Sequence, residues 1–239
     1  MTSRLHVPIP VRILFAIDIG FGVAYLLTYL LGNPIFLTAL VDLNREPSLP
    51  TWYSSVQWFC VAGLLGISAI HNFSFSERKS WLLLALPLVF LGLSVDEIVM
   101  IHEKISRLSD ALLPGGSRDG TLFFRTGLWV LLGIPFAALF VGLMISIRTY
   151  FRHAPGVLVK LCLGMAVTLA GAVGIEMLSN FVPHGAHAIG VSQILAEELC
   201  ELLGGTIVLW GSYEFLAEHR FAFTLDRVDT SGAPKTYQL

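Results

Sequence analysis

The sequence predicts an all-α protein, a polytopic membrane helical bundle with six transmembrane helices. Only 13% of its 239 residues are charged, whereas soluble domains carry about 25%. Several apolar runs are about 20 residues long, the length that an α-helix needs to cross the hydrocarbon core of a bilayer. The formal net charge is only -2, which excludes the strongly basic character of a nucleic-acid-binding protein. The expected partner is therefore the lipid bilayer.

The first three predicted spans cover residues 12–32, 52–71 and 80–103. Arg4 and Arg12 precede the first span, as they would in a signal peptide. The span is long, however, contains Asp18 and is followed by no A-x-A-like cleavage site, so we expect it to stay uncleaved. Trp52 and Tyr53, at the start of the second span, suit the membrane interface.

The last three predicted spans cover residues 122–147, 156–180 and 192–217. Pro135 is expected to kink the fourth span, which membrane helices tolerate. The fifth is rich in small residues that favour close helix packing: Gly164, Ala166, Ala170, Gly171, Ala172 and Gly174. Residues 1–218 would thus form the transmembrane domain, and residues 219–239 a polar, disordered cytoplasmic tail.

The distribution of basic residues predicts the orientation. The N-terminus, the second and fourth loops and the tail together hold ten of the fifteen lysines and arginines, and the other loops hold five. Because cytoplasmic segments are richer in Lys and Arg, both termini are expected in the cytoplasm, as an even number of spans requires. The expected location is the cell inner (plasma) membrane.

Ionisable side chains gather where three of these spans meet one side of the membrane. The third span ends in SVDEIVMIHEKIS, the fifth span carries one acid near its end, and the sixth begins with a group of three. Such residues are costly in hydrocarbon and are candidates for function. The candidates are Asp96, Glu97, His102, Glu103, Glu176, Glu197, Glu198 and Glu201.

Helical angles of about 100° per residue predict which candidates face one another. Glu197, Glu198 and Glu201 share one face of their helix. On the third span, Asp96 and Glu103 are seven residues apart and nearly in line, so we expect them to point inward, with His102 beside them. The same geometry makes Glu97 the outlier.

Clustered carboxylates repel one another and need protons, cations or basic partners. A divalent metal ion (iron, manganese or zinc) would suit carboxylate and imidazole ligands in a helical bundle. The predicted ligands are Asp96, His102, Glu103, Glu176, Glu197 and Glu201. Glu97 and Glu198 would then serve as the catalytic proton-transfer groups.

Three functions are compatible with this pattern. The first is a metal-dependent membrane enzyme acting on a lipid-like substrate, the second a small transporter coupled to protons or cations, and the third a non-catalytic subunit of a membrane complex. Asp18 lies at another depth, so we expect it to form a structural hydrogen bond to a neighbouring helix, with a place in a proton path as the alternative.

The stretches DLNREPSLPTWYSS, LSVDEIVMIHE and AEELCELLGG resemble segments of an uncharacterised bacterial family of multipass membrane proteins, which shares the DExxxxHE and EExxE helix motifs. This resemblance covers most of residues 35–217 and implies no activity. The membrane hydrolases of the alkaline ceramidase and progestin-receptor-like type use three zinc-binding histidines. The present chain departs from them, because its last span has acids where their closing His-x3-His pair belongs.

Overall fold

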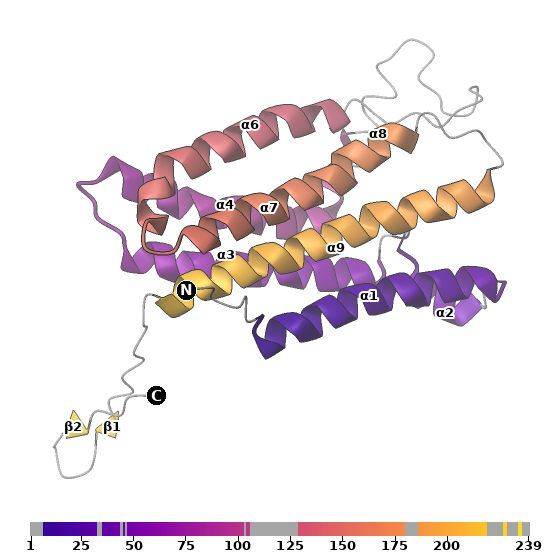
Figure 1. The fold of residues 1–239 in the computed structure, drawn as a ribbon, viewed down its shortest axis with the longest axis horizontal. Helices are drawn as coiled ribbons and strands as arrows, with labels where there is room; N and C mark the ends of the chain where they lie inside the picture. The colour runs from indigo at the N-terminus through magenta and orange to yellow at the C-terminus, as the bar shows by residue number, and fades with distance from the viewer. Residues whose placement is uncertain are drawn as a thin grey trace, which may run out of the picture.

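The fold is a bundle of long, antiparallel helices (Figure 1). The computed structural model describes residues 7–32, 35–43, 45, 47–102, 104–105, 129–179, 186–218, 227–228 and 234–235. The helices before the central gap are α1 (Ile9–Leu30), α2 (Ile35–Val41), α3 (Leu49–His71) and α4 (Arg78–Val99). After it come α6 (Trp129–Ile147), the 3-10 turn η2 (Arg148–Phe151), α7 (Pro155–Leu169), the π-helical turn η3 (Ala170–Ile175), α8 (Glu176–Ser179) and α9 (His187–Glu218). Within the predicted tail, the described residues are a short antiparallel pair of strands, β1 (Arg227–Val228) and β2 (Pro234–Lys235).

Five of the described helical segments are long and apolar enough to cross a membrane, which supports a multi-pass membrane protein. They are Ile9–Leu30, Leu49–His71, Arg78–Val99, Leu132–Phe151 and Pro155–Leu178. The helix α9 is 32 residues long but does not join this set, because its acids lower its hydropathy. A sixth span over α9 therefore stays a prediction. The helix α1 begins at the same end of the bundle as α9 ends (Figure 1).

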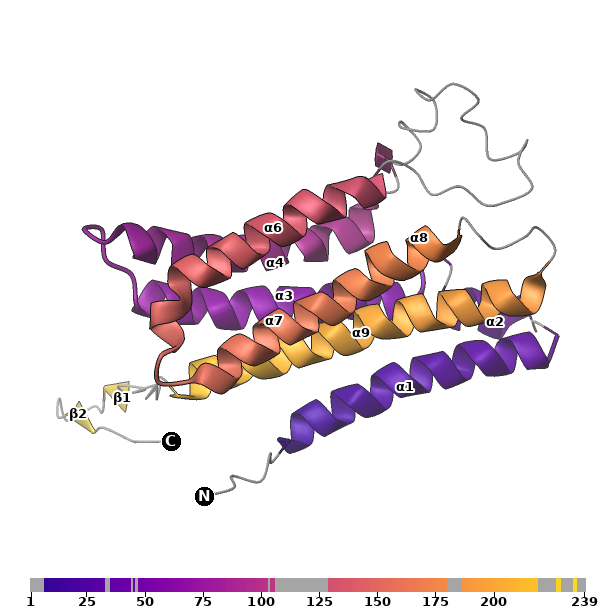
Figure 2. The same ribbon diagram turned by 45° about the horizontal axis from the view of Figure 1, so that its top comes forward.

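The helix α9 is the centre of the bundle. It packs against α7, α3, η3 and α1, whereas α1 and α6 lie on opposite outer sides (Figure 2). The main apolar core joins side chains of α3, α4, α6, α7 and α9 and includes the stacked rings of Trp58 and Phe90. A carboxylate on the inward faces of α9 is consequently surrounded by other helices rather than by lipid.

Small residues allow α7 and α9 to approach closely, as the sequence predicts. A Cβ atom on Gly164 would lie 2.6 Å from the carbonyl oxygen of Gly204, and one on Gly171 would lie 2.6 Å from that of Glu197. Neither space would hold a methyl group without a backbone shift. In contrast, Gly174 has no neighbour within 4 Å of such an atom, so only part of the small-residue pattern serves this contact.

The end of α4 departs from the predicted span. The sequence suggests a helix continuing to residue 103, but α4 ends at Val99, and Met100 adopts a left-handed conformation with φ 56°. The Met100 amide donates to the Asp96 carbonyl, which closes the helix in the manner of an αL C-cap. The chain therefore changes direction within the candidate motif.

Candidate carboxylate site at one end of the bundle

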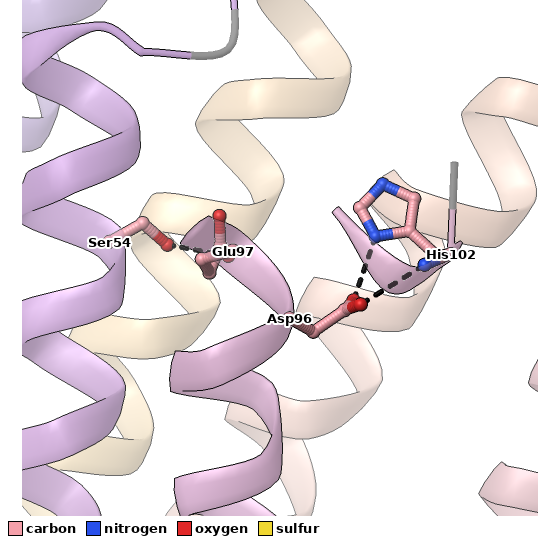
Figure 3. A network of polar contacts seen from close by, with 4 residues as sticks. All are labelled: Ser54, Asp96, Glu97 and His102. Atoms are coloured by element: carbon pink, nitrogen blue, oxygen red, sulfur yellow. Dashed lines mark hydrogen bonds and ion pairs between the residues drawn. The ribbon is translucent and has the colours of Figure 1, made fainter. Parts of the chain in front are cut away.

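The left-handed turn at Met100 brings His102 back onto the last turn of α4. The His102 ring nitrogen Nδ1 lies 2.7 Å from Asp96 Oδ2, and the His102 backbone amide donates to Asp96 Oδ1 at 3.1 Å (Figure 3). Asp96 thus binds both the backbone and the ring of one residue. This arrangement orients the imidazole, as carboxylates do for many functional histidines.

Glu97 points away from that pair and toward α3. Its Oε1 accepts a hydrogen bond of 2.8 Å from the hydroxyl of Ser54, on the side of α4 away from Asp96 (Figure 3). The prediction that Asp96 faces inward and Glu97 is the outlier is wrong for these two residues: Asp96 is engaged with His102, and Glu97 faces the acids of α9. Both residues lie within α4, so their directions depend on how α4 is rotated against α3 and α9, which helical angles alone do not specify.

Glu201 is the centre of the carboxylate cluster, which we define as Glu97, Glu176, Glu197, Glu198 and Glu201. Its carboxylate interacts electrostatically with the other four. Glu197 in turn interacts with Glu176 and with the imidazole of His102. Helices α4, α8 and α9 therefore deliver acids to one end of the bundle. Every electrostatic neighbour that the described residues provide for Glu201 carries the same sign of charge.

Among the described residues, the predicted metal ligands are not gathered into a coordination group. Within the part of the chain that the structure describes, no set of three or more His, Cys, Asp or Glu side chains is placed to hold a metal ion. Asp96 and His102 bind each other, and the His102 imidazole also interacts with Glu197 of α9. Glu103, the remaining predicted ligand, lies outside the described residues.

A second polar group lies deeper in the bundle around Asp18, which is fully buried. Its Oδ2 accepts a hydrogen bond of 2.7 Å from Thr206 on α9, and its Oδ1 accepts a long one of 3.5 Å from the Gln57 amide on α3. The same amide nitrogen donates to Thr206 Oγ1 at 2.7 Å and to the Tyr53 hydroxyl at 3.0 Å. Asp18 thus has the interhelical hydrogen bond expected from the sequence. We call Asp18, Tyr53, Gln57 and Thr206 the inner polar group.

One turn of α3 touches both polar groups. Ser54 binds Glu97 of the cluster, whereas Tyr53 and Gln57 belong to the inner polar group. Ser55 exchanges hydrogen bonds with Ser94 and so fastens α3 to α4 at the same level. Sequence analysis missed Ser54, Gln57 and Thr206, and it interpreted Tyr53 as an interface residue. The available signal was the run of polar residues inside a predicted span.

The comparisons with known proteins identify a family but no activity. Residues 13–216 match the family model described as "Domain of unknown function (DUF8692)". No curated protein and no solved structure matches the sequence.

Proposed function

The chain belongs to the DUF8692 family, whose description assigns no activity, and we propose from the geometry that it is a membrane carrier coupled to protons or cations. The carboxylate cluster would be the site at which the coupled ion binds. The bundle would lie in the cell inner membrane with both termini in the cytoplasm and the cluster on the outer side.

The proposal rests on the electrostatic environment of Glu201. Its carboxylate interacts with four other carboxylates, and together these acids come from the three helices α4, α8 and α9. Like charges this close do not ionise independently, so the cluster exchanges protons or binds cations as a unit. Ionisable groups in membrane helices are typical of such ion pathways. A cluster with this property binds or releases an ion when its environment changes, which is the elementary step of coupling.

The inner polar group extends this argument toward the middle of the bundle. Ser54, which binds the cluster, immediately follows Tyr53 in the chain and lies three residues before Gln57. An α-helix rises about 1.5 Å per residue, so these side chains lie within about one turn of α3. Asp18 therefore offers a second ionisable group within reach of the cluster, a feature that a carrier uses and that a surface enzyme does not need.

Proton movement in reconstituted vesicles tests the proposal. Vesicles containing the protein and a trapped pH dye are given an outward or inward gradient of Na⁺ or K⁺, one ion at a time. We expect a cation gradient to drive protons in the opposite direction, and Glu201→Gln to abolish this signal. Glu77→Gln, on the exposed turn between α3 and α4, is the matched control and should retain it.

Two results would contradict the proposal: no gradient moves protons, or Glu201→Gln moves them as fast as the parent protein. If the protein is a non-catalytic subunit of a membrane complex, no gradient should move protons. Glu201→Gln must run as a single species in size-exclusion chromatography, so that a loss of flux is not a loss of fold.

A metal-dependent membrane enzyme with a lipid-like substrate remains the second candidate, because Asp96 orients the His102 ring beside Glu197. In such a site iron, manganese or zinc would supply Lewis acidity. The described side chains do not fit a three-ligand site as they lie, so no catalytic step is derived from one. Metal analysis of the same dialysed preparation separates the two candidates: close to one or two equivalents, lost in a Glu197→Gln, Glu201→Gln double variant, would favour the enzyme.

A further inference from the structure

An apolar groove of about 400 Å³ lies between α1, α3 and α9, on the side of the inner polar group away from the carboxylate cluster. Its lining includes Val11, Leu14, Cys60, Leu64, Leu209 and Tyr213. This volume falls in the range of small-molecule sites. Two of the helices that line the groove, α1 and α3, are long and apolar enough to cross a membrane, so we expect an occupant that is soluble in the bilayer.

The helix register places the inner polar group one turn beyond the residues that line this groove, at the closed end of the groove. On α1 the lining residue Leu14 is followed one turn later by Asp18, and on α3 the lining residue Cys60 is preceded one turn earlier by Gln57. On α9, Thr206 likewise precedes Leu209 by one turn. Since residues three or four apart share a helix face, the same three faces that line the groove converge at its end on Asp18, Gln57 and Thr206.

The hydrogen bonds at this closed end are short of donors. Oδ1 of Asp18 receives a long 3.5 Å bond from Gln57, and the Tyr53 hydroxyl also interacts with the Asp18 carboxylate. Oε1 of Gln57, a residue that is 3% exposed, has no hydrogen-bond partner among the described residues. Every hydrogen-bond partner of Asp18 among those residues is neutral. A buried acceptor without a donor is costly, and a buried carboxylate is stabilised by a positive charge.

We propose that this groove binds a membrane-soluble amine, with its hydrocarbon chain between α1, α3 and α9 and its ammonium group at Asp18. The ammonium N–H groups supply the donor that Gln57 Oε1 lacks and can form a shorter bond to Asp18 than the 3.5 Å one from Gln57, and the ammonium charge complements the carboxylate. An ordinary lipid chain would fill the apolar part but would leave Gln57 Oε1 unsatisfied. The inference rests on the proposed function in that it names the substrate class of the coupled carrier.

Entry of the ammonium group requires α1 to move, because Asp18 is fully covered. The helix α1 lies on an outer side of the bundle (Figure 2) and packs mainly on α9 and α2. An element with few neighbours opens more readily than the centre of a core. The bond that the ammonium replaces, from Gln57 to Asp18, is the longest of the inner polar group.

Binding of three probes with the same chain length tests the proposal. The purified full chain in lipid nanodiscs is heated in the presence of decylamine, decanol or decanoate, at equal amounts per lipid. We expect decylamine to bind about tenfold more tightly than decanol, a difference of about 1.4 kcal/mol, and decanoate to show no stabilisation. Equal stabilisation by decylamine and decanol would mean that the groove takes only a lipid chain, and would overturn the proposal.

Two variants locate the effect. Asp18→Asn should remove the preference for decylamine over decanol. Gly63→Leu, at a groove position with open space, should abolish stabilisation by both probes without touching Asp18. Gly92→Leu, the same change at an exposed position of α4 with open space, is the matched control and should behave as the parent. A decylamine effect that survives in Gly63→Leu would place the binding elsewhere and refute this site.

The outcome is separable from that of the proposed function, because equilibrium binding needs no flux. Selective decylamine binding without coupled proton movement would keep the amine site and refute the carrier. Coupled proton movement without selective decylamine binding would do the reverse. If Asp18→Asn does not fold, the comparison of the probes in the parent protein and in Gly63→Leu still tests whether the groove binds the amine.

Discussion

At the scale of the residue, one backbone conformation brings His102 to Asp96. Met100 has a positive φ, a conformation that costs an ordinary residue about 1–2 kcal/mol. The hydrogen bonds from the Met100 amide to the Asp96 carbonyl and from the His102 amide to the Asp96 carboxylate offset that cost. The turn pairs Asp96 with His102, whereas Glu97, inside α4, bonds to Ser54.

The inner polar group depends on Thr206, the residue that binds both Asp18 and Gln57. Replacing Thr206 by Val keeps the side-chain shape but removes a donor and an acceptor from two buried groups, so we expect a loss of about 1–3 kcal/mol of stability. Thermal unfolding in detergent measures it.

Ser212→Ala is the control for this change, because its buried hydroxyl on the same helix bonds only to the Val208 carbonyl one turn earlier. That variant should unfold within a few degrees of the parent protein. If Thr206→Val is no less stable than Ser212→Ala, the hydrogen bonds around Asp18 do not hold α1, α3 and α9 together.

At the scale of the element, the close approach of η3 to α9 positions the carboxylate cluster. A Cβ atom on Gly171 would lie 2.6 Å from the Glu197 carbonyl oxygen and 2.9 Å from Cys200 Cβ. These atoms belong to the turn of α9 that carries Glu197 and Glu201. The π-helical turn thus supports the site as well as the bundle, consistent with the frequent occurrence of π turns at functional sites.

Gly171→Ala is expected to lower stability by about 1–3 kcal/mol, because the extra methyl group overpacks a contact with helix backbone. It should also reduce proton flux, because the added methyl group displaces α9, the helix that carries Glu197 and Glu201. Gly174→Ala, in the same turn with no neighbour within 4 Å, is the matched control; it gains helix propensity and should be neutral or slightly stabilising. Equal stabilities of the two variants would show that this contact does not position α9.

At the scale of the whole molecule, the arrangement of the helices predicts which segments face the same side of the membrane. The turn between α3 and α4 lies at the end where α1 begins, and the last turn of α4 lies at the opposite end (Figure 1). The excess of basic residues predicts that the first of these ends lies in the cytoplasm.

Single cysteines test this orientation in a variant lacking Cys60, Cys162 and Cys200. We expect a membrane-impermeant maleimide to label Lys104→Cys in intact cells and Glu77→Cys only after the membrane is opened, because both positions are exposed and lie at opposite ends. The reverse pattern would invert the orientation. Labelling of both positions from one side would contradict a membrane-spanning α4.

The sequence by itself determined the class of the protein and the approximate position of its helices. Apolar runs of about 20 residues predict membrane helices because transfer into hydrocarbon is a sum of local contributions. The same reasoning placed the acids of three separate segments at one end of the bundle. The sixth span and the orientation stay predictions, since the acids of α9 make this helix less apolar than the other five.

The tertiary structure alone decided how the polar side chains pair. Thr206 binds Asp18, 188 residues away, and Gln57, 149 residues away, and no local pattern specifies such partners. The pairing of Asp96 with His102 likewise follows from a turn at Met100 that helical periodicity does not contain. Hydropathy is a property of each residue by itself. A buried hydrogen bond between helices, in contrast, depends on the rotation, the end points and the packing of several helices at once.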